Sequence, residues 1–226
     1  MHMNESARID DVRPWYKSRF VYLIVAIISM IAVTPFLQGY VAIRILMDIF
    51  FSAIFLAAIF SISDRKRLRA FGAILALPTI VSLWTTYFMV NDAVFMVGRI
   101  FGILFFGFAI VQILQFIFRA KDVTKDVIFA AIVVYLLMPM MWSFIYGLLE
   151  VLQPGSFNIP AAHIHESRRL FMYFSFVTIT TLGYGDITPL AERATSFAIL
   201  EAVIGQIYLV VVVAWLVGMH VSRKSK

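Results

Sequence analysis

The sequence predicts an all-α membrane protein with six transmembrane helices and a re-entrant segment between the fifth and the sixth. The 226 residues are 62% hydrophobic and 14% charged, with a mean hydropathy of +0.92, whereas soluble domains are about half apolar. Six apolar segments come near the roughly 20 residues that a helix needs to cross a bilayer core. A further apolar stretch before the last segment is too short to cross and return as two helices.

The expected helices follow one another with short polar connections. They span residues 20–35, a second segment that ends at 62 after the turn TPFLQGY, and then 70–90, 93–118, 127–149 and 194–219. The chain is therefore expected to divide into a tail at 1–19, a four-helix membrane domain at 20–118, a linker at 119–126, a second membrane domain at 127–219 and a tail at 220–226.

The distribution of basic residues predicts the orientation in the membrane. Of the 19 Lys and Arg residues, 14 lie in the four stretches 8–19, 65–69, 119–125 and 223–226. Six crossings place all four stretches on one side, and short loops rich in Lys and Arg are cytoplasmic. Both termini are therefore expected in the cytoplasm. The net charge of +6 is explained without a nucleic-acid partner.

The stretch LFMYFSFVTITTLGYG, which begins at Leu170, belongs at membrane depth although it lies between two expected crossings. Irregular backbone is tolerated there only where protein buries it or where it lines a watery path. We therefore expect a short helix from 168 to about 179, capped by Ser167, that enters the membrane, followed by a return through 180–186. The carbonyl end of that helix would favour a cation near the membrane centre.

The motif TITTLGYGD, residues 178–186, gives two glycines a physical task. Gly183 and Gly185 permit backbone angles that side chains forbid, so that successive carbonyl oxygens can face one axis. Rings of carbonyl oxygens replace the water shell of an ion. One strand supplies one oxygen to each layer, so a ring requires several chains. Thr181 can add its hydroxyl oxygen, and we expect Leu182 and Tyr184 to point away from the axis and pack the strand in place.

The sequence TITTLGYGDITP, residues 178–189, resembles the signature of tetrameric potassium channels, with Leu182 where many members carry valine. The last 100 or so residues resemble the pore module of that family, and the six-helix layout resembles its larger members. The resemblance implies a homotetramer in the lipid bilayer that passes K+ passively. It also implies a selectivity filter formed by five residues, of which the first four bind K+ through their carbonyl oxygens: Thr181, Leu182, Gly183, Tyr184 and Gly185.

The resemblance assigns roles to neighbouring positions as well. Tyr173 and Phe174 fall where members often place paired tryptophans that brace the filter. Val177 lies where some members have a buried glutamate and others have valine. Thr180 leads into the filter, and Asp186 resembles the carboxylate at the outer mouth.

The last helix carries two features that remain open at this stage. Gly205 lies 20 residues after Gly185, the spacing of the hinge glycine proposed for the family, but glycine is also common at tight helix contacts. Glu201 is one turn earlier, and an intramembrane carboxylate is a functional candidate by default. We favour a supporting role for Glu201, through hydrogen bonds to the re-entrant helix.

The first four helices resemble a voltage sensor in layout but lack its charges. A sensor needs several arginines, because each charge moved contributes only about 2.3 kcal/mol per 100 mV. The fourth helix has Arg99 and no further basic residue before Arg119. We therefore expect no strong voltage gating. Arg44, Asp48 and Arg99 instead suggest structural ion pairs between the second and fourth helices, with a weak sensor as the alternative.

Together these features predict a potassium-selective channel of the cell membrane, in a prokaryote, with a non-conducting or regulatory channel-like subunit as the alternative. The chain has no Cys, so disulfides and thiolate metal sites are excluded. We expect no enzymatic activity, no cofactor other than K+ as the transported ion, and no nucleic-acid partner.

Overall fold

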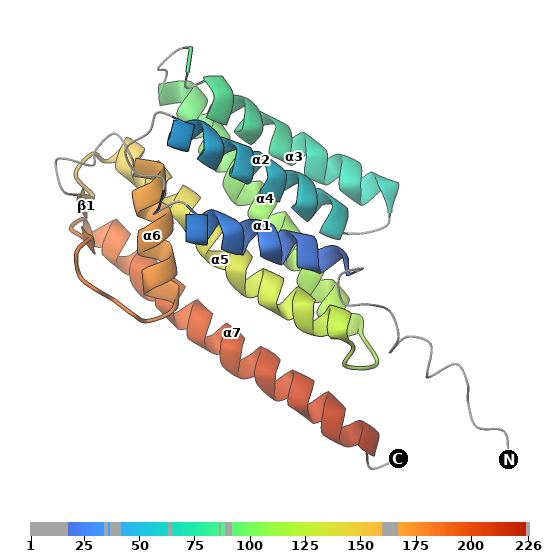
Figure 1. The fold of residues 1–226 in the computed structure, drawn as a ribbon. Helices are drawn as coiled ribbons and strands as arrows, with labels where there is room; N and C mark the ends of the chain where they lie inside the picture. The colour runs from blue at the N-terminus through green and yellow to red at the C-terminus, as the bar shows by residue number, and fades with distance from the viewer. Residues whose placement is uncertain are drawn as a thin grey trace, which may run out of the picture.

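The computed structural model describes residues 18–33, 36, 42–62, 65–85, 87–88, 92–159 and 167–224. The side chains of Arg44 and Ser167, which the sequence assigned to an ion pair and a helix cap, lie outside this description. The described residues form seven helices and one pair of short strands (Figure 1). The elements are α1 (Arg19–Val33), α2 (Ala42–Ile62), α3 (Lys66–Thr85), α4 (Asp92–Arg119), α5 (Lys125–Leu152), β1 (Phe157–Asn158), α6 (Ser167–Ile179), β2 (Thr188–Pro189) and α7 (Glu192–Lys224).

Five of the described helices, α2 to α5 and α7, are long and apolar enough to cross a membrane. The sixth expected crossing corresponds to α1, which has only 15 residues. At 1.5 Å per residue such a helix is roughly 22 Å long, which is short of a bilayer core of about 30 Å. The bounds of α1 match the expected 20–35 to within two residues, and those of α4 and α5 match their expected spans to within about three residues at each end.

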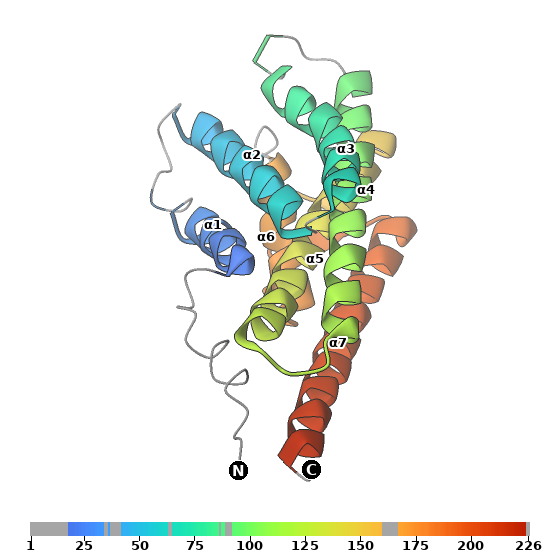
Figure 2. The same ribbon diagram turned by 90° about the vertical axis from the view of Figure 1, so that its right-hand side faces the viewer.

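Helix α5 lies at the centre of the arrangement. Helices α1 and α4 pack directly against it, and α2 and α3 complete the four-helix unit on that side. Helix α7 runs along the side of α5 that faces away from α1, α2 and α3, and α6 lies between α5 and the first half of α7 (Figures 1 and 2). This arrangement places the short α6 helix against both long helices of the second half of the chain.

A cluster of phenylalanines joins the four-helix unit to α5. Phe55 of α2 contacts Phe105 and Phe106 of α4, with ring centroids 4.6 and 5.1 Å apart. Phe144 of α5 meets Phe106 at 5.7 Å. Gly102 of α4 permits this approach, because a Cβ atom there would stand 2.5 Å from the Phe144 ring. The two expected membrane domains therefore share one continuous core, although a loop separates them in sequence.

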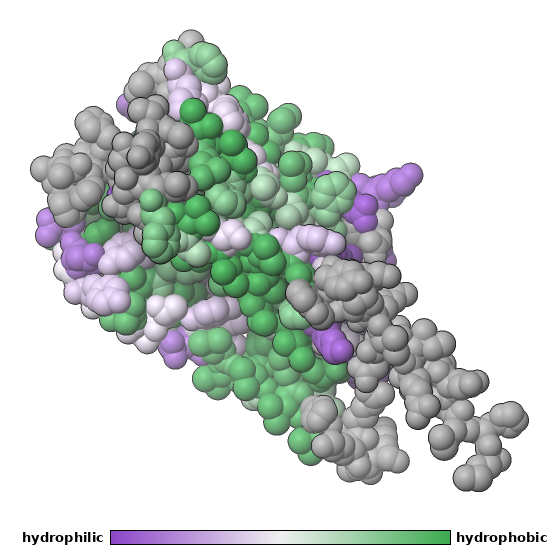
Figure 3. Space-filling model, viewed as in Figure 1, coloured by the Kyte–Doolittle hydropathy of each residue, from purple (hydrophilic) through white to green (hydrophobic). Residues whose placement is uncertain are grey.

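The surface is dominated by apolar side chains between two more polar ends (Figure 3). Helix α7 is the least covered of the five long helices, with 22% of its apolar window buried. Large side chains such as Ile207, Val210 and Val217 are more than half exposed along it. Apolar surface of this extent requires lipid or other protein chains as its surroundings.

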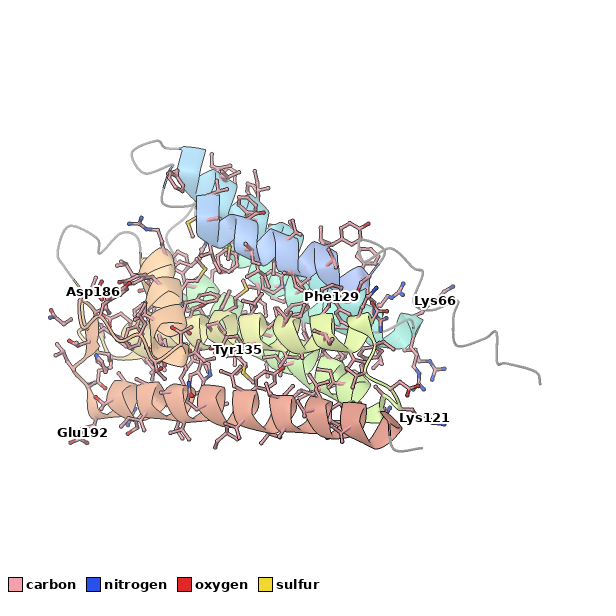
Figure 4. The ribbon with its side chains drawn as sticks, turned by 60° about the horizontal axis from the view of Figure 1, so that its bottom comes forward. Lys66, Lys121, Phe129, Tyr135, Asp186 and Glu192 are labelled. Atoms are coloured by element: carbon pink, nitrogen blue, oxygen red, sulfur yellow. The ribbon has the colours of Figure 1, made fainter. Side chains whose placement is uncertain are left out.

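Two labelled acidic residues and two labelled lysines lie at opposite ends of the molecule. Figure 4 places Asp186 and Glu192 at one end and Lys66 and Lys121 at the other. The acidic pair lies beside the start of α7, next to the loop that follows α6, whereas the two lysines lie in or next to the basic connections after α2 and α4. The TITTLGYGD motif and the basic connections are therefore on opposite ends of the molecule.

Candidate functional site

Helix α6 is held by a compact aromatic cluster at the acidic end of the molecule. Phe174 packs edge-on against Tyr146 of α5 at 5.1 Å and against Phe157 of β1 at 5.5 Å. Phe171 meets Phe157 at 5.0 Å, and Trp142 stacks on Tyr146 at 6.0 Å. Because α6 has only 13 residues, this packing and not its own length must stabilise it.

The segment after α6, residues 181–185, has a backbone that alternates in handedness. Thr181, Gly183 and Gly185 have φ values of 58°, 54° and 79°, whereas Leu182 and Tyr184 between them are not in the positive region. Alternation of this kind gathers successive N–H groups on one edge of the chain. The carbonyl oxygens, which point opposite to the N–H group of each peptide, are then left on the other edge.

The hydrogen bonds of this segment agree with that arrangement. The N–H groups of Leu182 and Gly183 both donate to the carbonyl oxygen of Val177, at 3.0 and 3.3 Å, and that of Thr181 donates to Thr178 at 2.9 Å. Within the described part of the chain, no hydrogen bond ends on the carbonyl oxygens of residues 181–185. The first three N–H donors of the segment are thus bound to the end of α6, while its carbonyl oxygens accept no hydrogen bond from the described residues.

Thr181 is the conformational outlier of the segment, because it is β-branched and has a positive φ. Such residues rarely adopt this region, and strain of this kind persists only where the surroundings enforce it, often at functional sites. The strained residue stands at the end of α6, where the helix dipole is negative. This location combines an unfavourable backbone with an electrostatic preference for a cation.

Leu182 and Tyr184 are 54% and 65% exposed in the single chain. The sequence led us to expect that they turn from the carbonyl edge and pack the strand in place. Since one chain does not cover them, any packing around their side chains must come from outside this chain.

The chain between the 181–185 segment and α7 is anchored at two points. Tyr173 of α6 donates a hydrogen bond to Asp186 Oδ2 at 2.7 Å, and β1 pairs with β2 in an antiparallel register, Phe157 with Pro189. The hydrogen bond and the strand pair together fix the chain after residue 185 to α6 and to β1.

The other positions named from the sequence lie in different surroundings. Phe174 is buried among aromatic rings of α5 and β1. Val177 is buried, and its carbonyl oxygen accepts the N–H groups of Leu182 and Gly183. Thr180 is exposed and its hydroxyl donates to the carbonyl oxygen of Phe176 at 2.7 Å.

Gly205 is a close-contact position on an unbroken helix. A Cβ atom there would lie 2.5 Å from Ile179 Cγ1 and 3.1 Å from the carbonyl oxygen of Ile179, the last residue of α6. Helix α7 continues through this position from Glu192 to Lys224. The contact accounts for the glycine by packing, and a hinge role stays a prediction.

Glu201 of α7 is fully buried and connects its own helix with α5 and α6 through hydrogen bonds. Its Oε2 atom accepts a hydrogen bond from the Tyr146 hydroxyl of α5 at 2.5 Å, and its Oε1 atom is hydrogen-bonded to Ser175 of α6. The supporting role that the sequence suggested for Glu201 is therefore present in the structure, because the carboxyl group connects α7 with α6 as well as with α5.

Within the expected ion-pair cluster, Asp48 pairs with an arginine that the sequence did not predict. Asp48 of α2, fully buried, pairs with Arg168 at the start of α6 and accepts a hydrogen bond from Tyr87 at 2.7 Å. Arg99 lies instead over Gly147 of α5, where a Cβ atom would be 2.8 Å from its Nε atom. The pair thus joins α2 to α6, and not α2 to α4.

Sequence reasoning missed Arg168 and Tyr87 as partners of Asp48. The available signal was the position of Arg168 in the first turn of α6. Helix spacing within α2 pointed to Arg44, because only residues on the same helix can be compared in that way.

The comparison with known families finds one match in this region. A family model described as "ion channel" matches residues 166–221, which contain α6, the 181–185 segment, β2 and most of α7. No curated protein and no solved structure matches the chain. The candidate site therefore lies within the part of the chain that is similar to an ion-channel domain, and the remainder is a multi-helix membrane unit packed against it.

Proposed function

We propose that this protein is a potassium-selective channel that conducts K+ passively across the membrane. The observation that carries the proposal is the 181–185 segment: its φ values alternate in sign, its bound N–H groups face the end of α6, and its carbonyl oxygens receive no hydrogen bond within the described chain. Carbonyl oxygens arranged in layers replace the hydration shell of K+. The K+ ligands would be the carbonyls of Thr181, Leu182, Gly183 and Tyr184 with the Thr181 hydroxyl.

The proposed assembly is a homotetramer. One chain supplies one oxygen to each layer, so a closed ring needs several copies. The exposed side chains of Leu182 and Tyr184 and the exposed apolar face of α7 are the surfaces that copies of this chain would cover. The same ring would enclose a water-filled path, which is the condition under which irregular backbone is tolerated at membrane depth.

The proposed orientation places the acidic end outside the cell. Asp186 and Glu192 lie at the end of the molecule opposite to Lys66 and Lys121 (Figure 4), and basic connections are retained in the cytoplasm. The protein would then lie in a cell membrane with its termini in the cytoplasm, Asp186 at the outer mouth of the pore and no need of a cofactor or an enzymatic step.

The experiment is ion flux through the purified protein in liposomes. We expect K+ flux to exceed Na+ flux by a large factor, since a ring of carbonyl oxygens discriminates between the two ions, and barium to block the K+ flux. Light scattering of the same detergent-solubilised sample should report four chains. Equal fluxes of the two ions, or a tetramer that passes neither ion, would contradict the proposal, and the second result would favour a non-conducting subunit.

A further inference from the structure

Glu201 is a buried acid that has no cationic partner among the described residues. It is fully buried within the candidate membrane span of α7. Its polar contacts are with Tyr146 and Ser175, and no basic side chain of the described residues pairs with it. A charged side chain in a membrane is costly and normally pairs with an opposite charge. The surroundings of Glu201 therefore differ from those of Asp48, which is equally buried but paired with Arg168.

The contacts around Glu201 form a chain of four oxygen-bearing groups. They are the Tyr146 hydroxyl, the Glu201 carboxyl, the Ser175 hydroxyl and the backbone carbonyl of Pro139. Tyr146 Oη lies 2.5 Å from Glu201 Oε2. Ser175 Oγ contacts Glu201 Oε1 and also lies 2.8 Å from the carbonyl oxygen of Pro139 on α5. Each of these three oxygen–oxygen contacts requires one proton. Tyr146 and Ser175 each have one to give, and the carbonyl of Pro139 can only accept.

We infer that Glu201 is a neutral carboxylic acid and that it supplies the third proton, from Oε1 to Ser175. Ser175 then donates to the carbonyl oxygen of Pro139, while Tyr146 donates to Glu201 Oε2. All three contacts are satisfied and no net charge is buried. If Glu201 were ionised, the Ser175 hydroxyl would have one proton for two acceptors. Its oxygen would then contact either the Pro139 carbonyl oxygen or Glu201 Oε1 with no proton between the two atoms, which is unfavourable in a medium of low dielectric.

The neutral acid acts on the candidate ion path through α6, an inference that rests on the proposed function. Ser175 lies two residues before Val177, whose carbonyl oxygen accepts the N–H groups of Leu182 and Gly183. Glu201 on α7 and Pro139 on α5 hold Ser175 from two sides. A displacement of Ser175 therefore shifts the acceptor on which the 181–185 segment is fixed. Glu201 is a positioning residue for that segment and does not touch the ion.

The groups that surround this carboxyl are few. Helix α5 presents Tyr146 and, one turn earlier, Trp142, whose Nε1 atom is buried without a partner in the described chain. Helix α6 presents Ser175. On α7 itself the next polar side chain of the same face is Tyr208, whose hydroxyl donates to the carbonyl oxygen of Ala131 at 2.6 Å. None of these groups carries a positive charge that would stabilise a carboxylate.

The direct test is the infrared spectrum of the whole protein in liposomes at neutral pH. The difference between wild type and Glu201→Gln isolates one carboxyl group. We expect it to contain the C=O stretching band of a protonated carboxylic acid, which shifts to lower frequency in D2O. Asp48→Asn is the matched control, because a paired Asp48 should contribute carboxylate bands instead. Carboxylate bands in the Glu201 difference spectrum would overturn the inference, whether or not the protein conducts ions.

The role in positioning is tested by K+ flux. Glu201→Ala should lower the flux by about tenfold, as expected for loss of buried hydrogen bonds, and Glu201→Gln should recover most of it. The Gln amide accepts from Tyr146 through oxygen and donates to Ser175 through nitrogen, which reproduces the neutral acid but not a carboxylate. A Gln variant as impaired as the Ala variant would contradict the inference. If wild type passes neither K+ nor Na+, the proposed function fails, and the infrared result still decides the state of Glu201.

Discussion

At the scale of single residues, the backbone angles of the 181–185 segment determine what this site can do. Three of five consecutive residues have positive φ, and only two of those three are glycines. A side chain in the left-handed region costs about 1–2 kcal/mol. Thr181 bears such strain, whereas Gly183 and Gly185 avoid it. A Cβ atom at either glycine would meet nothing within 4 Å. Glycine is therefore needed at these two positions for its backbone angles, which orient the carbonyl oxygens, and not for lack of space.

We predict that Gly185→Ala abolishes selective K+ flux and leaves assembly intact. The Cβ atom has room in the chain, so the effect comes from the φ of 79°, and a shift to negative φ would turn the adjacent carbonyl from the axis. Flux in liposomes and the mass of the assembly are the measurements. Gly218→Ala is the matched control, because Gly218 also has open space but lies within helix α7. A Gly185→Ala variant with unchanged selectivity would refute this account of the segment.

At the scale of elements, the short helix α6 depends on its neighbours. It is fixed by the aromatic cluster with Tyr146 and Phe157, by the Glu201 contacts, and at its start by the Asp48–Arg168 pair. The last of these connects α6 to the four-helix unit of the same chain. A change in the position of α2 therefore acts directly on the helix that carries the candidate site.

The Asp48–Arg168 pair leads to an asymmetric prediction. The Asp48 side chain is 1% exposed and that of Arg168 is 30% exposed. Arg168→Ala leaves a buried carboxylate with Tyr87 as its remaining partner among the described residues and should reduce stability by about 3 kcal/mol. Asp48→Ala leaves an arginine that water can reach, so the loss should be nearer to about 1 kcal/mol. Thermal unfolding in detergent measures both.

The double variant provides the control for this asymmetry. Removal of both charged groups should be less harmful than the sum of the two single changes, because the uncompensated buried carboxylate is gone. Strictly additive losses would show that the two side chains do not interact in the folded protein.

At the scale of the whole molecule, the four-helix unit is joined to α5 mainly through its fourth helix. Its fourth helix carries one arginine within the membrane span, Arg99, and that side chain lies against Gly147 of α5 in the shared core. An Arg99 packed in this way is a fixed charge and not one of a series that moves past the membrane field. The tight core between α4 and α5, with Phe144 against Gly102, opposes sliding of α4 as a unit.

We therefore predict shallow voltage dependence. A single charge contributes about 2.3 kcal/mol per 100 mV even if it crosses the whole field, so the K+ current in planar bilayers should change gradually with voltage. Arg99→Gln should leave the slope of the current–voltage relation unchanged. Steep opening over a few tens of millivolts, lost in Arg99→Gln, would show that the arginine moves and that the unit is a sensor.

The features that could be read from the sequence are local ones. Apolar length placed α4, α5 and α7, because a membrane span needs about 20 apolar residues irrespective of its neighbours. The motif TITTLGYGD located the end of α6 and the segment after it, since the spacing of the glycines reports backbone angles directly. The bounds of α1 agree with the expected 20–35 to within two residues, and its 15 residues are fewer than the roughly 20 that cross a bilayer core.

By itself, then, the sequence determined the membrane character of this protein, the positions of its long helices and the backbone requirement at Gly183 and Gly185. The tertiary structure alone decided the partners: Arg168 for Asp48, Tyr146 and Ser175 for Glu201, and the aromatic rings around Phe174. The physical reason is that these contacts join residues 17 to 120 positions apart. They depend on how each helix is rotated against the next, and helices that are apolar on nearly every face leave that rotation undetermined until they pack.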